Sequence, residues 1–325
     1  MKNQLTDISG LKVGQDYDAK VSTGVTVVLP DAPVLCAVDV RGGGPGTRET
    51  DALSADGSVT HVHAIVLAGG SVYGLAAADA VCAALGAKGI GYKVAPPPVP
   101  VSPIVPAAIL FDNANGGDKN WGDTPPFAKL GRQALDNAAT DFKQGKAGAG
   151  YGATAGIYPG GLGSASERVG DITVSALIAA NPIGSPYMPQ ENGKSTDCFW
   201  AWDCEVDGEY GGRKPPSDYT PSPARDTKLE FLRARGASTV IGVVATDAKL
   251  SHAELRSLAI MAQDGIALAV RPSHTPMDGD TLFAISTETR PISAPRVVAL
   301  SELGGAAARC VARALSRGIY LASKT

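Results

Sequence analysis

The sequence predicts an α/β protein whose sheets are covered by helices, and three observations support this fold class. Short stretches rich in Val, Ile and Ala alternate along the chain with longer alanine-rich or amphipathic stretches. The sequence contains no internal repeat. With 325 residues, of which 44% are hydrophobic and 19% charged, the chain has an ordinary globular balance and is long enough to bury a large core.

Seven stretches are predicted to be buried strands because they are short and rich in β-branched residues or alanine. They are residues 25–29, 34–40, 63–67, 107–111, 172–179, 240–245 and 282–286.

Helices are predicted between these strands. Residues 75–85 follow a glycine turn, and residues 127–142 and 251–270 are amphipathic. Ser251 and Glu254 have the spacing of a capping box at the start of the third helix. A last helix places five apolar residues on one face: Leu300, Leu303, Ala307, Val311 and Ala314.

Composition argues against several classes of protein. The net charge of −3 and the pI near 5.8 provide no basic face for nucleic acid. The opening MKNQLTDISGLKVG lacks the apolar core of a signal peptide, and no later run reaches about 18 uninterrupted apolar residues. The five cysteines are an odd number and widely scattered, which favours reduced thiols. We therefore expect a cytoplasmic protein with neither nucleic-acid nor membrane partners.

The sequence contains little that indicates a metal site or a cofactor site. His61 and His63 share a face at a strand entrance, but no third ligand is apparent. Cys198 and Cys204 have a spacing that suits zinc poorly. The glycine-rich RGGGPGTRETD, which starts at Arg41, resembles a phosphate loop without the necessary lysine. We therefore expect no metal and no organic cofactor.

Ser71 lies in LAGGSVYGLAAADA, which runs from a strand through a glycine turn into a helix. One interpretation is an esterase nucleophile at Ser71, but the position two residues later is Tyr73 where such a turn needs glycine. A second is an anion site at the helix N-terminus. The third is a close strand-to-helix turn with Ser71 as N-cap. A supporting role for Ser71 beside an active site is a further interpretation.

The segment TPMDGDTLFAIST places Asp278 and Asp280 two residues apart around a glycine, directly before a strand. Asp-Gly-Asp is a good turn sequence. Two carboxylates at a strand entrance can also anchor an amine or polarise a hydroxyl. The residues alone leave both interpretations open.

Ser238 and Thr239 lie where a long polar stretch, residues 183–238, meets the β-branched run 240–245. A loop of that length without periodicity is typical of a functional or cleaved segment. A hydroxyl nucleophile needs a base, and cutting the chain directly before Thr239 supplies an α-amine on the same residue. Such an amine titrates near pH 7.7–8.0 in model compounds. The arrangement suits an N-terminal-nucleophile hydrolase as well as ordinary strand-entry hydroxyls.

Four segments together resemble the L-aminopeptidase/D-esterase family, which includes β-peptidyl aminopeptidases and endo-type nylon-oligomer hydrolases. They are LTDISGLKVG, HAIVLAGGSVYGLAAADAV, TVIGVVATDAKL and HTPMDGDTLFAIST, spread from residue 5 to residue 287. The resemblance implies a single αββα sandwich over residues 1–325 that cuts itself into subunits 1–238 and 239–325. It also implies a homotetramer of the paired subunits.

The resemblance also implies roles for individual residues. Thr239 matches the nucleophile, with cleavage at Ser238–Thr239, although close relatives in the family have Asn where this chain has Ser238. Cleavage before Ser238 is a lesser alternative. Asn181 matches the oxyanion donor, and Asp278 and Asp280 match carboxylates beside the nucleophile.

The substrate pocket is expected to include Phe111, Ile157 and Ser71. Phe111 and Ile157 stand where the nylon-oligomer branch has Tyr and Lys, which implies a less polar wall. The expected reaction is hydrolysis of peptides or amino-acid amides with a free amino end. The alternatives are internal cleavage of 6-aminohexanoate oligomers and, more distantly, a serine esterase that uses Ser71.

Overall fold

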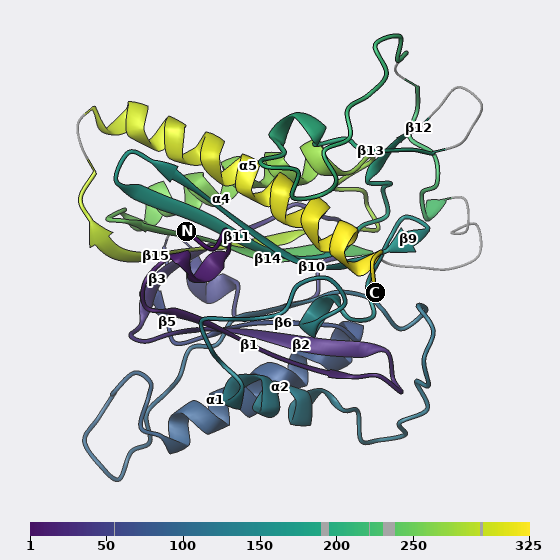
Figure 1. Ribbon diagram of the computed structural model, residues 1–325. Coiled ribbons are helices and arrows are strands. Elements are labelled where there is room, and N and C mark those ends of the chain that lie inside the picture. Colours follow the sequence, from purple (N-terminus) through teal and green to yellow (C-terminus); the bar gives the residue numbers. More distant parts are fainter. Residues whose placement is uncertain (55, 190–194, 221, 230–237, 293–294) are drawn as a thin grey trace.

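Two sheets pack face to face, and a layer of helices covers each outer face (Figure 1). The computed structural model describes residues 1–325 except 55, 190–194, 221, 230–237 and 293–294. The predicted αββα sandwich is confirmed by this arrangement, in which the helices α4 and α5 lie on one side and α1 and α2 on the other.

The larger sheet has six strands among the described residues, in the order β10-β11-β14-β15-β3-β5. β14 and β15 are parallel, whereas every other neighbouring pair is antiparallel. All positions of β11 are buried, as expected for a strand covered on both faces. The strands are β10 (Gly161–Val169), β11 (Ile172–Asn181), β14 (Thr239–Ala248), β15 (Thr281–Arg290), β3 (Val34–Val40) and β5 (His61–Val62).

The second sheet has five strands in the described part of the chain, in the order β1-β2-β6-β7-β4. β6 and β7 are parallel, and the other neighbours are antiparallel. Its strands are β1 (Leu11–Asp18), β2 (Thr23–Pro30), β6 (Ile65–Ala68), β7 (Ala107–Ile109) and β4 (Thr47–Arg48).

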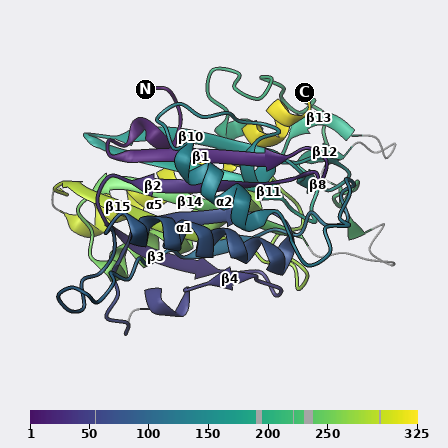
Figure 2. The ribbon, with the colours of Figure 1, turned by 90° about the horizontal axis from the view of Figure 1, so that it is seen from below.

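The long helices provide the two outer layers. They are α1 (Ala76–Ala87), α2 (Phe127–Asp136), α4 (His252–Ala269) and α5 (Arg296–Ala322). Viewed from below, α1 and α2 lie over the strands of the five-stranded sheet (Figure 2). Ser251 caps α4 with the predicted capping box, because its hydroxyl accepts from the Glu254 N–H while the Glu254 carboxylate accepts from the Ser251 N–H.

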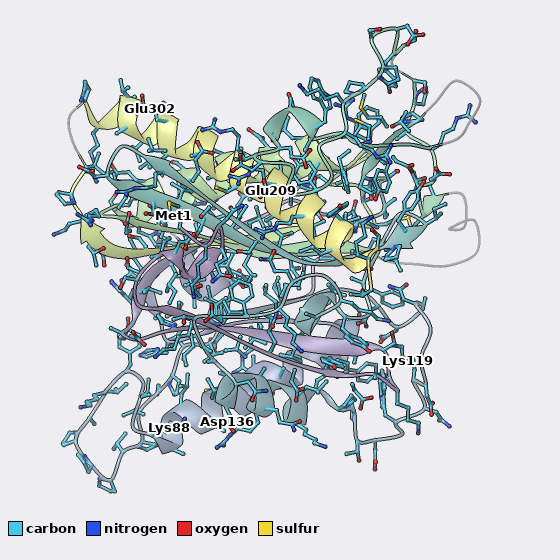
Figure 3. All side chains as sticks on the ribbon, viewed as in Figure 1. Met1, Lys88, Lys119, Asp136, Glu209 and Glu302 are labelled. Atoms are coloured by element: carbon cyan, nitrogen blue, oxygen red, sulfur yellow. The ribbon has the colours of Figure 1, made fainter. Side chains whose placement is uncertain are left out.

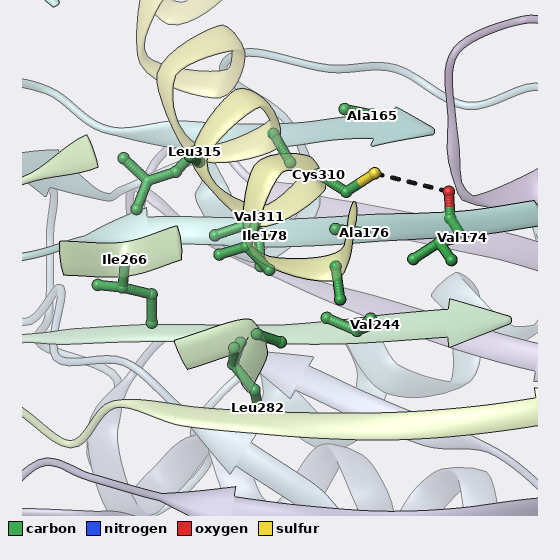
Figure 4. Packing of buried hydrophobic residues seen from close by; sticks show 14 of the residues in the cluster. Ala165, Val174, Ala176, Ile178, Val244, Ile266, Leu282, Cys310, Val311 and Leu315 are labelled. Atoms are coloured by element: carbon green, nitrogen blue, oxygen red, sulfur yellow. Dashed lines mark hydrogen bonds between the residues drawn. The ribbon is translucent and has the colours of Figure 1, made fainter. Parts of the chain in front are cut away.

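Three apolar cores separate the four layers. One lies between α4, α5 and the larger sheet, where Val311 and Leu315 of α5 face Ile178 of β11 (Figure 4). Cys310 behaves there as a small apolar residue, with its thiol directed to the Val174 carbonyl at 3.6 Å. The second core lies between the sheets, and the third lies between the smaller sheet and α1 and α2.

The sequence-based prediction misplaced the end of one helix and missed some of the strands. The helix predicted over 127–142 ends at Asp136, because the chain then turns and Ala139 pairs with Val13 of β1 through main-chain hydrogen bonds. The strands β1 and β10 were not predicted, since their Gly, Lys, Asp and Ser residues interrupt the apolar pattern.

The segment 183–238 has more structure than its sequence predicted. It contains an antiparallel pair of strands, β12 (Tyr187–Pro189) and β13 (Ser195–Phe199), and residues 190–194, 221 and 230–237 lie outside the described part. A short hairpin joins β8 (Thr154–Ala155) to β9 (Tyr158–Pro159). Five short 3₁₀ helices complete the described elements: η1 (Leu5–Asp7), η2 (Asp51–Leu53), η3 (Ser71–Leu75), η4 (Gly148–Gly150) and η5 (Trp202–Cys204).

Candidate active site

The site is built where the end of β11 meets the beginnings of β14 and β15. β11 and β14 are antiparallel, and Asn181, the last residue of β11, lies opposite Thr239, the first residue of β14. Directly opposed residues of antiparallel strands have Cα atoms about 4.5–5.5 Å apart. The sheet therefore brings together two candidate residues that are 58 positions apart in the sequence.

The Ser238–Thr239 junction has a specific geometry. The Thr239 hydroxyl donates a hydrogen bond to the Ser238 carbonyl oxygen at 2.5 Å, and the Gly279 N–H donates to the same oxygen at 3.0 Å. The Ser238 N–H donates to the Met277 carbonyl at 3.1 Å. Ser238 and Thr239 are both buried, and the Ser238 hydroxyl has no hydrogen-bond partner among the described residues. The Ser238 carbonyl is thus held and polarised beside the Thr239 hydroxyl.

Asp280 fixes the start of β14. One carboxylate oxygen accepts from the Val240 N–H at 2.8 Å, and the other accepts from the His274 N–H at 3.1 Å and lies 2.8 Å from His274 Nδ1. Burial alone opposes protonation of His274, but the hydrogen bond to Asp280 and its charge outweigh this effect and raise the pKa of His274. Sequence reasoning had given His274 no definite role.

Asp278 is held by main-chain donors. Its oxygens accept from the Thr275 N–H at 2.9 Å and the Ile183 N–H at 3.3 Å. Burial and the neighbouring Asp280 carboxylate raise the pKa of Asp278 to about 6. A carboxyl group with such a pKa can exchange a proton near neutral pH, which suits acid–base work.

The glycine-rich segment that starts at Arg41 supports the loop that carries these aspartates. Its main-chain N–H groups at Arg41 and Gly44 donate to the carbonyl oxygens of Asp280 and Asp278, at 2.9 Å and 2.8 Å. The small residues of this segment let two backbones approach closely. Its resemblance to a phosphate loop therefore has a structural explanation.

The Asn181 side chain lies inside a polar network. Its amide oxygen accepts from the Thr154 N–H at 3.0 Å and from Asn115 Nδ2 at 3.2 Å, while its Nδ2 donates to the Phe111 carbonyl at 2.9 Å. An amide nitrogen carries two hydrogens, so one remains for a further acceptor. Asn181 is fully buried and is thereby fixed in one orientation.

Lys228 joins this network and was missed by sequence reasoning. Its Nζ lies 3.1 Å from the Asn181 side-chain oxygen and 3.2 Å from the Asn181 carbonyl oxygen. Burial lowers the pKa of Lys228 to about 7, although the charges of Asp278 and Asp112 act in the opposite direction. A single lysine in a polar, proline-rich stretch carries no pattern that distinguishes it from a surface lysine.

Comparison with known proteins identifies the family. The sequence model of peptidase family S58 matches residues 3–325 of the chain. The chain belongs to this family. It is therefore a hydrolase that acts on amide bonds.

Relatives of this S58 peptidase include proteins named for two activities. An uncharacterized aminopeptidase of Mycobacterium tuberculosis (strain ATCC 25618 / H37Rv) is 39% identical over 335 residues, which cover 98% of this chain and 93% of the relative. A 6-aminohexanoate-oligomer endohydrolase of Kocuria sp. (strain KY2) is 32% identical over 290 residues, which cover 87% of this chain and 74% of the relative. Both names describe hydrolysis of amide bonds.

Solved structures confirm the fold of this S58 peptidase. A β-aminopeptidase of Burkholderia sp. superposes with a TM-score of 0.68 at 21% identity, over 98% of this chain and 86% of that one. The L-aminopeptidase D-Ala-esterase/amidase of Ochrobactrum anthropi gives 0.67 at 21% identity, over 97% and 85%. The latter is described as a variant of the Ntn hydrolase fold.

The residues predicted for the substrate pocket of this S58 peptidase lie in different places. Phe111 contacts Asn181 through its carbonyl, and the Ser71 N–H donates to the neighbouring Leu110 carbonyl at 3.0 Å. Ile157 is 48% exposed, and its N–H donates to the Asp226 carbonyl at 3.1 Å, two residues from Lys228. Phe111 is therefore in contact with Asn181, while Ile157 lies at the surface.

Ser71 is not an N-cap, contrary to the third interpretation of its turn. Gly70 occupies that position with a φ of +80°, and Ser71 begins η3. The reason is Asp112, a buried carboxylate whose oxygens accept from the Gly70 N–H and the Thr23 hydroxyl, both at 2.7 Å. A carboxylate from a distant segment thus accepts the main-chain hydrogen bond of this turn.

The histidines at the strand entrance have protein partners. His63 Nδ1 accepts from the Ile104 N–H at 3.1 Å, and His61 Nε2 lies 3.1 Å from a Glu288 carboxylate oxygen. Within the described ranges, no group of three or more His, Cys, Asp or Glu residues is arranged to hold a metal ion. In the same ranges, no helix is long and apolar enough to cross a membrane.

Proposed function

We propose that this protein is a self-processing amidohydrolase whose nucleophile is Thr239, freed as an N-terminus by cleavage after Ser238. One observation carries the proposal: the Thr239 hydroxyl lies 2.5 Å from the Ser238 carbonyl oxygen, which also accepts the Gly279 N–H. An oxyanion donor acts best 2.7–3.1 Å from the oxygen that develops charge. The Gly279 N–H, at 3.0 Å, meets that requirement for the attack on Ser238.

Self-cleavage proceeds in two steps. The Thr239 oxygen attacks the Ser238 carbonyl carbon, and the carbon–nitrogen bond then breaks as the hydroxyl proton passes to the nitrogen. The product is an ester between the Ser238 acyl group and the Thr239 oxygen, with a free Thr239 amine. Water then hydrolyses the ester to give subunits 1–238 and 239–325.

The mature enzyme uses the same oxygen. The Thr239 amine accepts the hydroxyl proton as the oxygen attacks the amide carbonyl of the substrate, and the leaving amine takes that proton. Asn181 Nδ2 and the Gly279 N–H stabilise the oxyanion. Asp278 and Asp280 orient the start of β14, and water releases the acyl group from Thr239.

The substrate is an amide or short peptide with a free amino end. The names of the 39%-identical relatives favour this class over internal cleavage of 6-aminohexanoate oligomers. Parallel assays on alanine p-nitroanilide and on a 6-aminohexanoate oligomer separate the two. Faster hydrolysis of the oligomer at internal bonds would favour the alternative.

The proposal is tested by the fate of the junction in purified protein. We expect two bands on a denaturing gel, of about 24 and 9 kDa in proportion to 238 and 87 residues of the 33.1 kDa chain, and Thr239 as the first residue of the smaller. Thr239→Ala leaves one inactive 33.1 kDa band. Ser238→Ala is still cut, because it removes only a hydroxyl that has no hydrogen-bond partner in the described part of the chain.

Two results would contradict the proposal. Activity in an uncut chain would exclude the free amine as the base. Loss of activity in Ser71→Ala, together with full activity in Thr239→Ala, would favour the serine-esterase alternative.

A further inference from the structure

Lys228 is a charged group inside the candidate site that the proposed mechanism does not use. Its ammonium group contacts both oxygens of Asn181. Among the described residues, no carboxylate oxygen lies within 4.0 Å of it. Asp278 and Asp112 nevertheless lie near enough to influence its charge. Removing an ammonium group from water is costly, so a lysine placed there needs an explanation.

The contacts of Lys228 define the orientation of the Asn181 amide. The Asn181 side-chain oxygen faces three donors: Lys228 Nζ, the Thr154 N–H and Asn115 Nδ2. A rotated amide would direct its NH₂ group at these donors, which cannot accept hydrogen bonds while Lys228 is protonated and Asn115 keeps its orientation. The Asn181 NH₂ group is therefore directed away from Lys228, toward Phe111.

Lys228 is itself anchored by the main chain. Its N–H donates to the Ile183 carbonyl at 3.0 Å, and the Ile183 N–H donates to the Asp278 carboxylate at 3.3 Å. Two residues earlier, Asp226 accepts from the Tyr158 hydroxyl at 2.8 Å. A Cβ on Gly156 would lie 2.2 Å from the Asp226 carbonyl oxygen, so glycine is needed there. These contacts hold Lys228 independently of the peptide bond proposed to be cut.

We propose that Lys228 is a positioning residue that holds the Asn181 amide with its NH₂ group available to the oxyanion, in self-cleavage and in substrate hydrolysis. This inference rests on the function proposed above. An ammonium group on the amide oxygen also polarises the amide, which makes the Asn181 NH₂ group a stronger donor. Protonated Lys228 therefore supports the reaction more than neutral Lys228 does.

Self-cleavage gives the cleanest test, because the uncut chain has no Thr239 amine to titrate in the same pH range. Chains made by cell-free translation are followed on denaturing gels between pH 5.5 and 9. We expect the wild-type rate to fall as the pH rises through about 7, where Lys228 loses its proton. Lys228→Met should slow cleavage about 10-fold or more at pH 6.5 and abolish this alkaline fall.

Two further variants separate charge from folding. Lys228→Arg, which stays protonated throughout, should cleave faster than Lys228→Met and lack the fall above pH 7. Lys119→Met is the matched control, since the Lys119 ammonium also contacts two carbonyl oxygens, those of Val21 and Ser22, and lies near Asp112. Among the described residues, no hydrogen bond joins Lys119 to Asn181, so Lys119→Met should keep the wild-type profile. Circular dichroism checks that each variant is folded.

A double variant tests whether Lys228 acts through Asn181. If it does, Lys228→Met adds little to the loss already caused by Asn181→Ala. Three results would overturn the inference. The rate losses of Lys228→Met and Asn181→Ala could multiply in the double variant, Lys228→Met could cleave at the wild-type rate, or Lys228→Arg could be as slow as Lys228→Met. Cleavage of Thr239→Ala would instead refute the proposed function, so the two failures are distinguishable.

Discussion

Asn181 and Thr239 lie directly opposite each other on the antiparallel strands β11 and β14, and each is the terminal residue of its strand. The pairing sets the amide donor and the proposed nucleophile at a fixed separation. It places both at one edge of the larger sheet, beside the loop that carries Asp278 and Asp280.

Replacing Asn181 tests its role as an oxyanion donor. We expect Asn181→Ala to lower kcat of the cleaved enzyme about 10²–10³-fold with little change in KM, because the donor acts mainly on the charge of the transition state. The measurement is steady-state kinetics on alanine p-nitroanilide. Asn137→Ala, which removes an exposed amide at the end of α2, is the control. A change confined to KM would show that Asn181 only binds the substrate.

Gly279 lies against the nucleophile, where a side chain has no room. A Cβ at this position would lie 2.9 Å from the Thr239 hydroxyl oxygen and 2.7 Å from the Gly44 carbonyl oxygen. We expect Gly279→Ala to slow self-cleavage about 10- to 100-fold by shifting the hydroxyl or the Gly279 N–H. Gly86→Ala in α1 is the control, since a Cβ at this position would make only ordinary van der Waals contacts with Pro103. Equal cleavage rates in both variants would contradict this prediction.

His274 and Asp280 should give stability a defined pH dependence. The folded-state pKa of His274 is raised, so the stabilisation is complete below its unfolded value near 6.5 and is lost as the pH rises through the folded value. His274→Asn suits the residue's φ of +55° and cannot titrate. Urea denaturation should show this variant less stable than wild type by about 1–2 kcal/mol at pH 5.5, with a smaller difference at pH 8.5. A difference independent of pH would contradict the raised pKa of His274.

The two proposed subunits should remain together after cleavage. β14 and β15 would belong to the small subunit, yet they lie between β11 and β3 of the large one. Separation would break two antiparallel strand pairings inside the larger sheet. We expect both fragments to elute together at a multiple of 33.1 kDa in native size-exclusion chromatography, and a fourfold mass would support the expected homotetramer. Fragments that elute apart without denaturant would contradict this.

A buried ion pair also joins the two proposed subunits. Glu209 lies beside α5 (Figure 3). Arg313 of that helix contacts Glu209 at 2.5 Å, with side-chain exposures of 4% and 7%. Arg313→Met leaves the buried Glu209 carboxylate with the Asn3 amide at 2.6 Å and the Arg317 guanidinium at 4.0 Å, and should lower the free energy of unfolding by about 2–3 kcal/mol. Arg132→Met removes an exposed pair with Asp136 and should cost at most about 0.5 kcal/mol. Chemical denaturation of both variants measures the contrast, and similar losses would contradict it.

Sequence reasoning succeeded where the signal was local. The capping box of α4 and the strands around 34–40 and 240–245 each depend on a few neighbouring residues. It failed for α2, where pairing of Ala139 with Val13 ends the helix early, and for Ser71, where Asp112 supports the turn from 41 residues away. In both cases a contact between residues distant in the sequence determined the local structure, and the pattern of neighbouring residues did not.

The sequence by itself determined that this chain alternates strands and helices and that two adjacent hydroxyl residues stand at the start of a buried strand. It could do so because hydrophobic periodicity and turn chemistry depend on neighbouring residues. Only the tertiary structure decided that Asn181 faces Thr239, that Gly279 donates to the Ser238 carbonyl and that Lys228 contacts Asn181. These relationships depend on strand order and register, which form when distant segments bury their apolar faces together, and no short stretch of sequence contains them.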